Sequence, residues 1–134
     1  MKARKTELFE RDPFANSLGI KIIEVEAGHA VLEMAITESH LNFLGAAHGG
    51  ALFALADMAF GVASNTEDTV RVGVDAHMAY IEKVELADRL SAHAYKVSEN
   101  RRTAVYRVDI KRDQDDIASF TGTVCITNRA FGTD

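Results

Sequence analysis

The stretch that decides the fold is residues 42–65, which read NFLGAAHGGALFALADMAFGVASN. It is rich in Ala, Leu and Phe and has no proline, so we expect one long helix from about Gly49 to Ser64, with Gly61 as its one interior breaker. This helix is apolar on every side apart from Asp57, and such a helix is expected to be buried. Burying an unpaired carboxylate is costly, which makes Asp57 a candidate functional residue.

The rest of the chain reads mainly as strands joined by short turns. Two strand-like segments precede the long helix, and four follow it with a period-two pattern of β-branched and aromatic residues. The expected strands are 20–26, 30–37, 70–81, 89–99, 102–112 and 116–127. Consecutive strands with short connections pair in antiparallel fashion, because parallel pairs need long crossovers. We therefore expect an α+β fold in which a curved antiparallel sheet wraps around one central helix.

The N-terminal segment predicts a second, short helix. Asp12 can cap a helix that Pro13 begins, and Gly19 can end it after about Leu18. A chain of 134 residues suits one domain with one core, so we expect a single domain over 1–134. Residues 1–11 and 129–134 are expected to be flexible.

Composition narrows the class of partners. The net charge of −5 argues against a general nucleic-acid surface. A single cysteine, Cys125, excludes an intramolecular disulfide and fits a reducing compartment; it is expected in the core. The N-terminus has no apolar signal-peptide core, and the longest apolar run is too short to span a membrane. We expect a cytoplasmic protein without membrane or nucleic-acid partners.

The spacing within the long helix constrains any site. His48 and Asp57 are nine positions apart, which in one helix is a rise of about 13 Å and about half a turn. They cannot meet one substrate atom within one chain. If both are functional, Asp57 must meet the His48-Gly49 end of a second copy, which predicts an isologous dimer with two composite sites. Taken singly, His48 can equally be a helix cap, and Asn42 and Gly45 can equally be turn residues.

The central motif, N-x-x-G-x-x-H-G-G-x-x-F-x-L-A-D-x-A-x-x-x-A-S-N, closely resembles the signature of hotdog-fold thioesterases of the phenylacetate-degradation (PaaI-like) group. Weaker similarities occur at residues 12–20, 101–108 and 120–124. The resemblance implies the hotdog fold and hydrolysis of a medium-chain or aromatic acyl-CoA. It implies no cofactor, since coenzyme A is part of the substrate, and a homodimer that commonly pairs into a homotetramer.

The resemblance also implies roles for the residues that match the motif. Asp57 would be the general base or the nucleophile, and the backbone N–H of Gly49 would bind the thioester carbonyl oxygen. Asn42 and His48 would position substrate and water. Elementary chemistry agrees, because helix N-terminal amides stabilise an oxyanion and a carboxylate in apolar surroundings is a stronger base.

Other candidate positions lie outside the motif. Gly73 stands where many relatives carry a Ser or Thr that binds the catalytic water, so Gly73 and the nearby Asp75 are candidate substrate-binding residues. The phosphates of coenzyme A need a basic cluster, and Arg101-Arg102 is the best candidate, although such a pair can also be merely solvated. Lys83 and Arg89 are alternatives.

Metal binding is not expected, because the histidines have no metal-ligand spacing among themselves. The histidines concerned are His29, His40, His77 and His93. Two other functions stay open: a non-catalytic acyl-CoA-binding module and a hotdog dehydratase. The dehydratase is disfavoured, because the two glycines after His48 follow the thioesterase signature.

Overall fold

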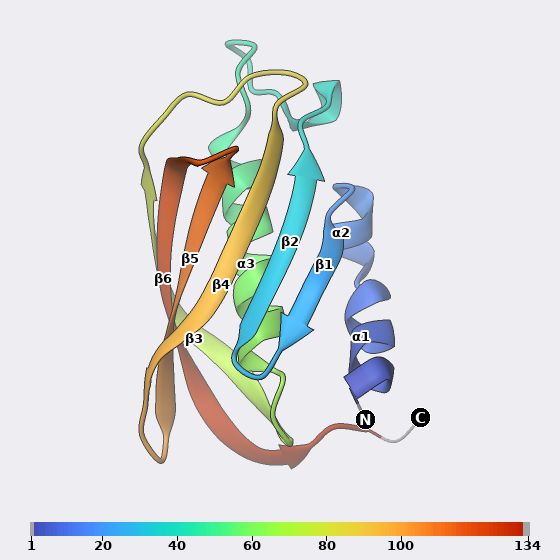
Figure 1. Ribbon diagram of the computed structural model, residues 1–134, viewed down its shortest axis with the longest axis vertical. Coiled ribbons are helices and arrows are strands. Elements are labelled where there is room, and N and C mark those ends of the chain that lie inside the picture. Colours follow the sequence, from blue (N-terminus) through green and yellow to red (C-terminus); the bar gives the residue numbers. More distant parts are fainter. Residues whose placement is uncertain (1, 133–134) are drawn as a thin grey trace.

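Six antiparallel strands form one curved sheet in the computed structural model, which describes residues 2–132 (Figure 1). The strands are β1 (Lys21–Glu26), β2 (His29–Ala35), β3 (Thr69–Tyr80), β4 (Arg89–Glu99), β5 (Thr103–Arg112) and β6 (Asp115–Ala130). Their order across the sheet is β1-β2-β4-β5-β6-β3, so β1 and β3 are the edge strands. The helices are α1 (Lys2–Glu10), α2 (Pro13–Ser17), the 3₁₀ helix η1 (Glu38–His40) and α3 (Gly49–Ser64).

The long helix α3 lies in the concave side of the sheet, as expected from the sequence (Figure 1). Its buried residues include Leu55 and Phe60, and Phe60 stacks against Phe120 and Tyr106 of the sheet. This arrangement confirms the α+β hotdog architecture. No helix within residues 2–132 is both long and apolar enough to cross a membrane.

The short helix α2 forms as predicted. The Asp12 side chain accepts a hydrogen bond from the N–H of Ala15 at 2.9 Å, and Pro13 is the first helical residue. Gly19 has φ of +75°, a conformation that favours glycine, and it ends the helix.

The chain ends carry regular structure, and their predicted flexibility stays a prediction. Helix α1 covers most of residues 1–11; its Phe9 packs on the core, and Lys5 donates a hydrogen bond to the backbone of Glu67. Strand β6 continues to Ala130, and residues 133–134 lie outside the described part. The sequence of α1 shows no clear apolar stripe, so its docking depends on contacts distant in sequence.

The placement of Cys125 was predicted wrongly. Its neighbour Val124 is buried, and adjacent residues of a strand face opposite sides, so Cys125 is exposed.

Candidate active site

The N-terminus of α3 is capped by His48. Its Nδ1 accepts a hydrogen bond from the N–H of Gly50 at 2.8 Å. Because Nδ1 is an acceptor, the neutral ring carries its proton on Nε2. His48 therefore acts as a helix cap, the alternative that the sequence left open, and its remaining nitrogen is a hydrogen-bond donor rather than a base.

The N–H of Gly49 is the free donor of this helix end. Among residues 2–132 it has no hydrogen-bond acceptor, as expected for the first turn of a helix. The carbonyl of Gly49 accepts a hydrogen bond from the hydroxyl of Tyr80 at 3.1 Å. A free N–H at the positive end of a 16-residue helix is suited to binding an oxyanion.

The loop before α3 is shaped by Asn42. Its Oδ1 accepts hydrogen bonds from the N–H groups of Leu44 and Ala46, at 2.9 and 3.1 Å. Gly45 has φ of +84°, so the turn requires a residue that tolerates a left-handed conformation. The Asn42 oxygen is thus engaged in the turn, and its amide NH₂ has no acceptor in the part of the chain that the structure describes.

Asp57 lies on the one face of α3 that the sheet leaves uncovered. This stripe consists of Gly50, Ala54, Asp57 and Gly61, and no atom lies within 4 Å of a Cβ built on Gly61. The expectation that α3 is buried all round was therefore wrong for the single chain, because Asp57 is exposed. The sequence could not show which face of an apolar helix the sheet would leave open.

The carboxylate of Asp57 has no hydrogen bond or ion pair to any described residue. Desolvation by its surroundings raises the pKa of Asp57, and the nearby charge of Asp12 raises it further. A carboxylate with a raised pKa and no structural partner is the pattern of a general base or nucleophile.

Asp57 and Gly49 lie on one continuous helix, Gly49–Ser64. Eight positions along an α-helix correspond to a rise of about 12 Å. The two groups therefore cannot act on one reacting carbon within a single chain.

Gly73 and Asp75 lie on opposite faces of β3. Gly73 pairs with Val124 and Asp75 with its neighbour Thr123, since a bulge separates them. A Cβ on Gly73 would lie 3.1 Å from the ring of Phe60. The structure thus gives Gly73 a packing role against α3, and it does not bring the two residues together.

Arg101 and Arg102, the residues predicted to bind coenzyme A, lie in the exposed β4–β5 turn. In this turn the side-chain oxygen of Asn100 accepts hydrogen bonds from the N–H groups of Arg102 and Thr103, at 2.8 Å each. This turn lies near the C-terminal end of α3, at the opposite end of the sheet from Gly49 (Figure 1). Within one chain, the arginines and the helix N-terminus do not form one site.

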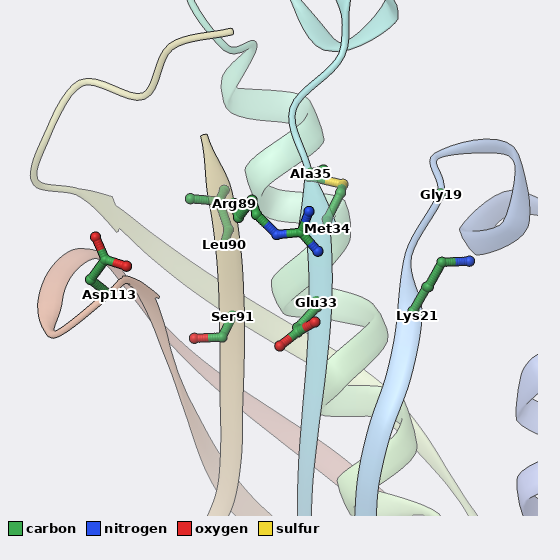
Figure 2. A pocket seen from close by; sticks show the side chains of 9 residues that line it. All are labelled: Gly19, Lys21, Glu33, Met34, Ala35, Arg89, Leu90, Ser91 and Asp113. Carbon is green, nitrogen blue, oxygen red and sulfur yellow. The ribbon is translucent and has the colours of Figure 1, made fainter. Parts of the chain in front are cut away.

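The alternative basic residue Arg89 lines a hollow of about 340 Å³ on the convex face of the sheet (Figure 2). Glu33 comes from β2 and Lys21 from β1, and Asp113 comes from the β5–β6 turn. Acidic and basic side chains both line this hollow, and no residue of α3 is among those that line it. It is therefore not the candidate active site.

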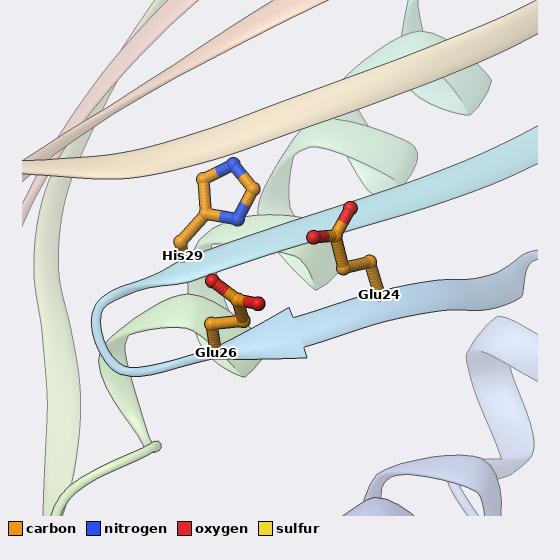
Figure 3. A group of neighbouring side chains, drawn as sticks. All are labelled: Glu24, Glu26 and His29. Carbon is orange, nitrogen blue, oxygen red and sulfur yellow. The ribbon is translucent and has the colours of Figure 1, made fainter.

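One mixed cluster of possible metal ligands lies on the β1–β2 hairpin (Figure 3). Glu26 pairs with His29 across the hairpin, and Glu24 lies two residues before Glu26 on the same face of β1. The possible ligand atoms of the three side chains lie within 4.8 Å of one another. Both carboxylates are exposed, and exposed acidic groups often gather without a metal. The cluster does not by itself indicate a metal centre.

Comparison with known proteins places this geometry in a family. Residues 44–119, which include all of α3, match the family model "Thioesterase superfamily". The chain belongs to the thioesterase superfamily. The acyl-coenzyme A thioesterase PaaI of Escherichia coli is 34% identical to this thioesterase over 116 residues, which are 86% of this chain and 83% of PaaI.

Solved structures show the same fold for this thioesterase. The E. coli PaaI structure aligns with a TM-score of 0.91 at 31% identity, covering 98% of this chain and 97% of PaaI. A mutant of PaaI from Thermus thermophilus aligns with a TM-score of 0.83 at 41% identity, covering 85% of this chain and 98% of the T. thermophilus chain. A hypothetical thioesterase protein with coenzyme A from Streptococcus pneumoniae aligns with a TM-score of 0.79 at 28% identity, covering 84% of this chain and 91% of the S. pneumoniae chain.

Two residues of this thioesterase that support the helix N-terminus were missed by sequence reasoning. Tyr80 contacts Gly49 from β3, and the carbonyl of the buried His40 accepts a hydrogen bond from the N–H of His48 at 2.7 Å. The His40 ring is itself held by the backbone of Thr37 and Leu18. Tyr80 lies at the end of a strand with no pattern that marks a contact to α3. His40 takes the third position of a capping box that begins at Thr37, where the usual sequence signature has Glu or Gln, so the sequence carried no signal for it.

Proposed function

We propose that this thioesterase hydrolyses a medium-chain or aromatic, phenylacetyl-type acyl-CoA to the free acid and coenzyme A, at a site shared by two copies of the chain. The observation that carries the proposal is the position of Asp57. It is a carboxylate with no partner among the described residues and with a raised pKa, on the uncovered, small-residue face of α3, in a chain that belongs to the thioesterase superfamily.

Two features support a second copy on this face. The stripe of small residues leaves room for the close approach of another helix, since Gly61 has open space above it. Strand β3 is a sheet edge, and its Val72 and Val74 are 50% and 60% exposed. Unpaired edges favour pairing with another strand. An isologous dimer joined along α3 and β3 would bring Asp57 to Gly49 of the partner subunit. Pairing of dimers into a homotetramer stays a prediction.

The proposed reaction uses these groups in a defined order. Asp57 removes a proton from water, and the water oxygen attacks the thioester carbonyl carbon. The N–H of Gly49 of the partner subunit stabilises the negative charge on the carbonyl oxygen. The intermediate collapses as the carbon–sulfur bond breaks, and the departing thiolate of coenzyme A takes the proton held by Asp57, which restores the carboxylate.

A second route uses the same groups. The Asp57 carboxylate attacks the carbonyl carbon directly and expels the thiolate, which leaves an anhydride that water then hydrolyses. Incorporation of ¹⁸O from labelled water into Asp57 during a single turnover would identify this route, because a general base never exchanges its carboxylate oxygens with the attacking water.

The substrate class rests on the relatives. PaaI of E. coli is an acyl-coenzyme A thioesterase, and the S. pneumoniae structure contains coenzyme A. We propose that coenzyme A enters as part of the substrate and that the protein uses no cofactor. Hydrolysis of a thioester by water can proceed without a metal when the site supplies both a carboxylate base and an oxyanion donor.

Thiol release from a panel of acyl-CoA thioesters tests the proposal. The panel contains phenylacetyl-, hydroxyphenylacetyl-, benzoyl-, hexanoyl- and palmitoyl-CoA, with wild type, Asp57→Asn and the control Asp68→Asn, which changes an exposed carboxylate after α3. Asp57→Asn is expected to lower kcat about 10²- to 10⁴-fold, while the control keeps the wild-type rate. Near-wild-type hydrolysis by Asp57→Asn would refute the mechanism. Binding without thiol release by wild type would instead identify an acyl-CoA-binding module.

A further inference from the structure

We propose that Tyr80 is a positioning residue for the reaction, because it holds the peptide unit that follows the oxyanion donor. This inference rests on the proposed function of Gly49. It adds to that function a residue from the edge strand β3, outside the helix motif.

Two side chains hold one peptide plane from its two ends. The Tyr80 hydroxyl donates to the carbonyl oxygen of Gly49 at 3.1 Å, and His48 Nδ1 accepts from the N–H of Gly50 at 2.8 Å. That carbonyl and that N–H belong to the same planar peptide unit, between Gly49 and Gly50. Hydrogen bonds at both ends of a plane prevent it from rotating.

Such a clamp is needed at this place in the chain. Two consecutive glycines have the greatest backbone freedom of any residue pair, and the first-turn N–H groups lack intrahelical acceptors. An oxyanion donor is effective only when its direction is fixed before the reaction. The N–H of Gly49 belongs to the preceding peptide unit, whose His48 carbonyl accepts from the N–H groups of Ala51 and Leu52 at 3.0 and 3.3 Å. With the following unit held as well, both units flanking Gly49 are restrained, and its N–H keeps its direction along the helix axis.

The two glycines also make room for the two clamping side chains. A Cβ on Gly49 would lie 3.4 Å from the Tyr80 ring, and a Cβ on Gly50 would lie 2.9 Å from His48 Nδ1. Tyr80 itself is fixed by strand pairing with Ala118 of β6. The His-Gly-Gly sequence and Tyr80 thus form one unit, although 30 positions separate Gly50 from Tyr80.

The variant Tyr80→Phe tests the clamp, because it removes the hydroxyl and keeps the ring of a residue that is 52% exposed. We expect kcat for acyl-CoA to fall about tenfold with KM within about twofold, since an oxyanion donor acts on the transition state. The matched control is Tyr95→Phe, which removes a 3.3 Å hydrogen bond to Asp109 on the convex face. It is expected to leave kcat unchanged.

A second measurement does not depend on catalysis. Amide hydrogen exchange at Gly50, followed by NMR in the intact protein, is expected to accelerate at least about threefold in Tyr80→Phe and to stay unchanged in Tyr95→Phe. Unchanged exchange at Gly50 overturns the clamp, whatever happens to kcat. Faster exchange with kcat within twofold of wild type overturns the catalytic part of the inference. If wild type hydrolyses no thioester, the proposed function fails, and the exchange data still decide whether the clamp exists.

Discussion

Asp12 and Asp57 lie on neighbouring helices, and the charge of Asp12 adds to the desolvation that raises the pKa of Asp57. Asp12 is at the same time the cap of α2. The residue that caps the start of α2 therefore also raises the pKa of the candidate catalytic residue on α3.

The raised pKa makes Asp57 a cost to stability at neutral pH. The folded state binds the proton of Asp57 more readily than the unfolded chain does, so stability falls as pH rises from the ordinary value of 3.8 through the raised pKa. We expect Asp57→Asn to raise the Tm at pH 7, and this gain to vanish below pH 3.8. Thermal unfolding of both proteins across this range checks it. An Asp57→Asn protein with a lower Tm than wild type at pH 7 would contradict the prediction that the Asp57 carboxylate destabilises the fold.

The composite site can be tested by mixing two variants that are each expected to be inactive: one lacks the Asp57 carboxylate, and the other lacks the His48 side chain that holds the Gly49–Gly50 peptide unit. In a heterodimer of Asp57→Asn and His48→Ala chains, one of the two sites is intact. Random exchange of subunits should restore about a quarter of wild-type activity, because about half of the dimers are mixed and half of their sites are whole. No recovery, with heterodimers demonstrated by mass spectrometry, would show that each chain carries its own site.

The uncovered face of α3 can be blocked at Gly61. Replacement by Leu favours the helix, but it places a bulky side chain where a partner helix must approach, at an expected cost of about 1–3 kcal/mol. The dimer Kd should therefore rise by about one to two orders of magnitude in analytical ultracentrifugation. Val97→Leu, which adds bulk at an exposed site of β4, is the control. An unchanged Kd for Gly61→Leu would place the dimer interface elsewhere.

The role of the β4–β5 turn can be separated from the chemistry. If Arg101 and Arg102 bind the phosphates of coenzyme A, replacing both by Ser should raise KM for acyl-CoA about tenfold. The KM for the same acyl group on N-acetylcysteamine, which lacks phosphates, should not change. Arg107→Ser on the convex face is the control. Equal effects on both substrates would mean that the turn acts on structure rather than on phosphate.

The buried Arg71 depends on Glu99 for its charge partner. Their side chains are 2.7 Å apart, and hydrogen bonds from Arg71 and then Lys96 lower the pKa of Glu99. We expect Glu99→Gln to lower the free energy of unfolding at pH 7 by about 1–3 kcal/mol in urea titrations. Because the pKa is lowered, this contribution is present above pH 4.5 and is lost as pH falls through the lowered pKa. A urea midpoint for Glu99→Gln equal to that of wild type would show that the fold does not depend on the ion pair of Arg71 with Glu99.

Local sequence determined the secondary structure well. The caps and periodicity predicted α2, α3 and all the strands of the sheet, since each signal lies within or beside its own element. The motif around Asp57 and Gly49 also sufficed to predict a thioesterase, and helix geometry alone showed that these two residues cannot meet within one chain.

Tertiary structure decided what local patterns do not contain. The apolar sequence of α3 does not say which face the sheet leaves open, because that depends on where strands distant in sequence pair, and this is why Asp57 is exposed in the single chain. The docking of α1 and the outward side of Cys125 depend on long-range packing and strand register in the same way. The contact between Tyr80 and Gly49 exists only because β3 returns beside the start of α3. Residues 42–65 thus predict the candidate chemistry through a local motif, and the sheet decides on which surface Asp57 is presented.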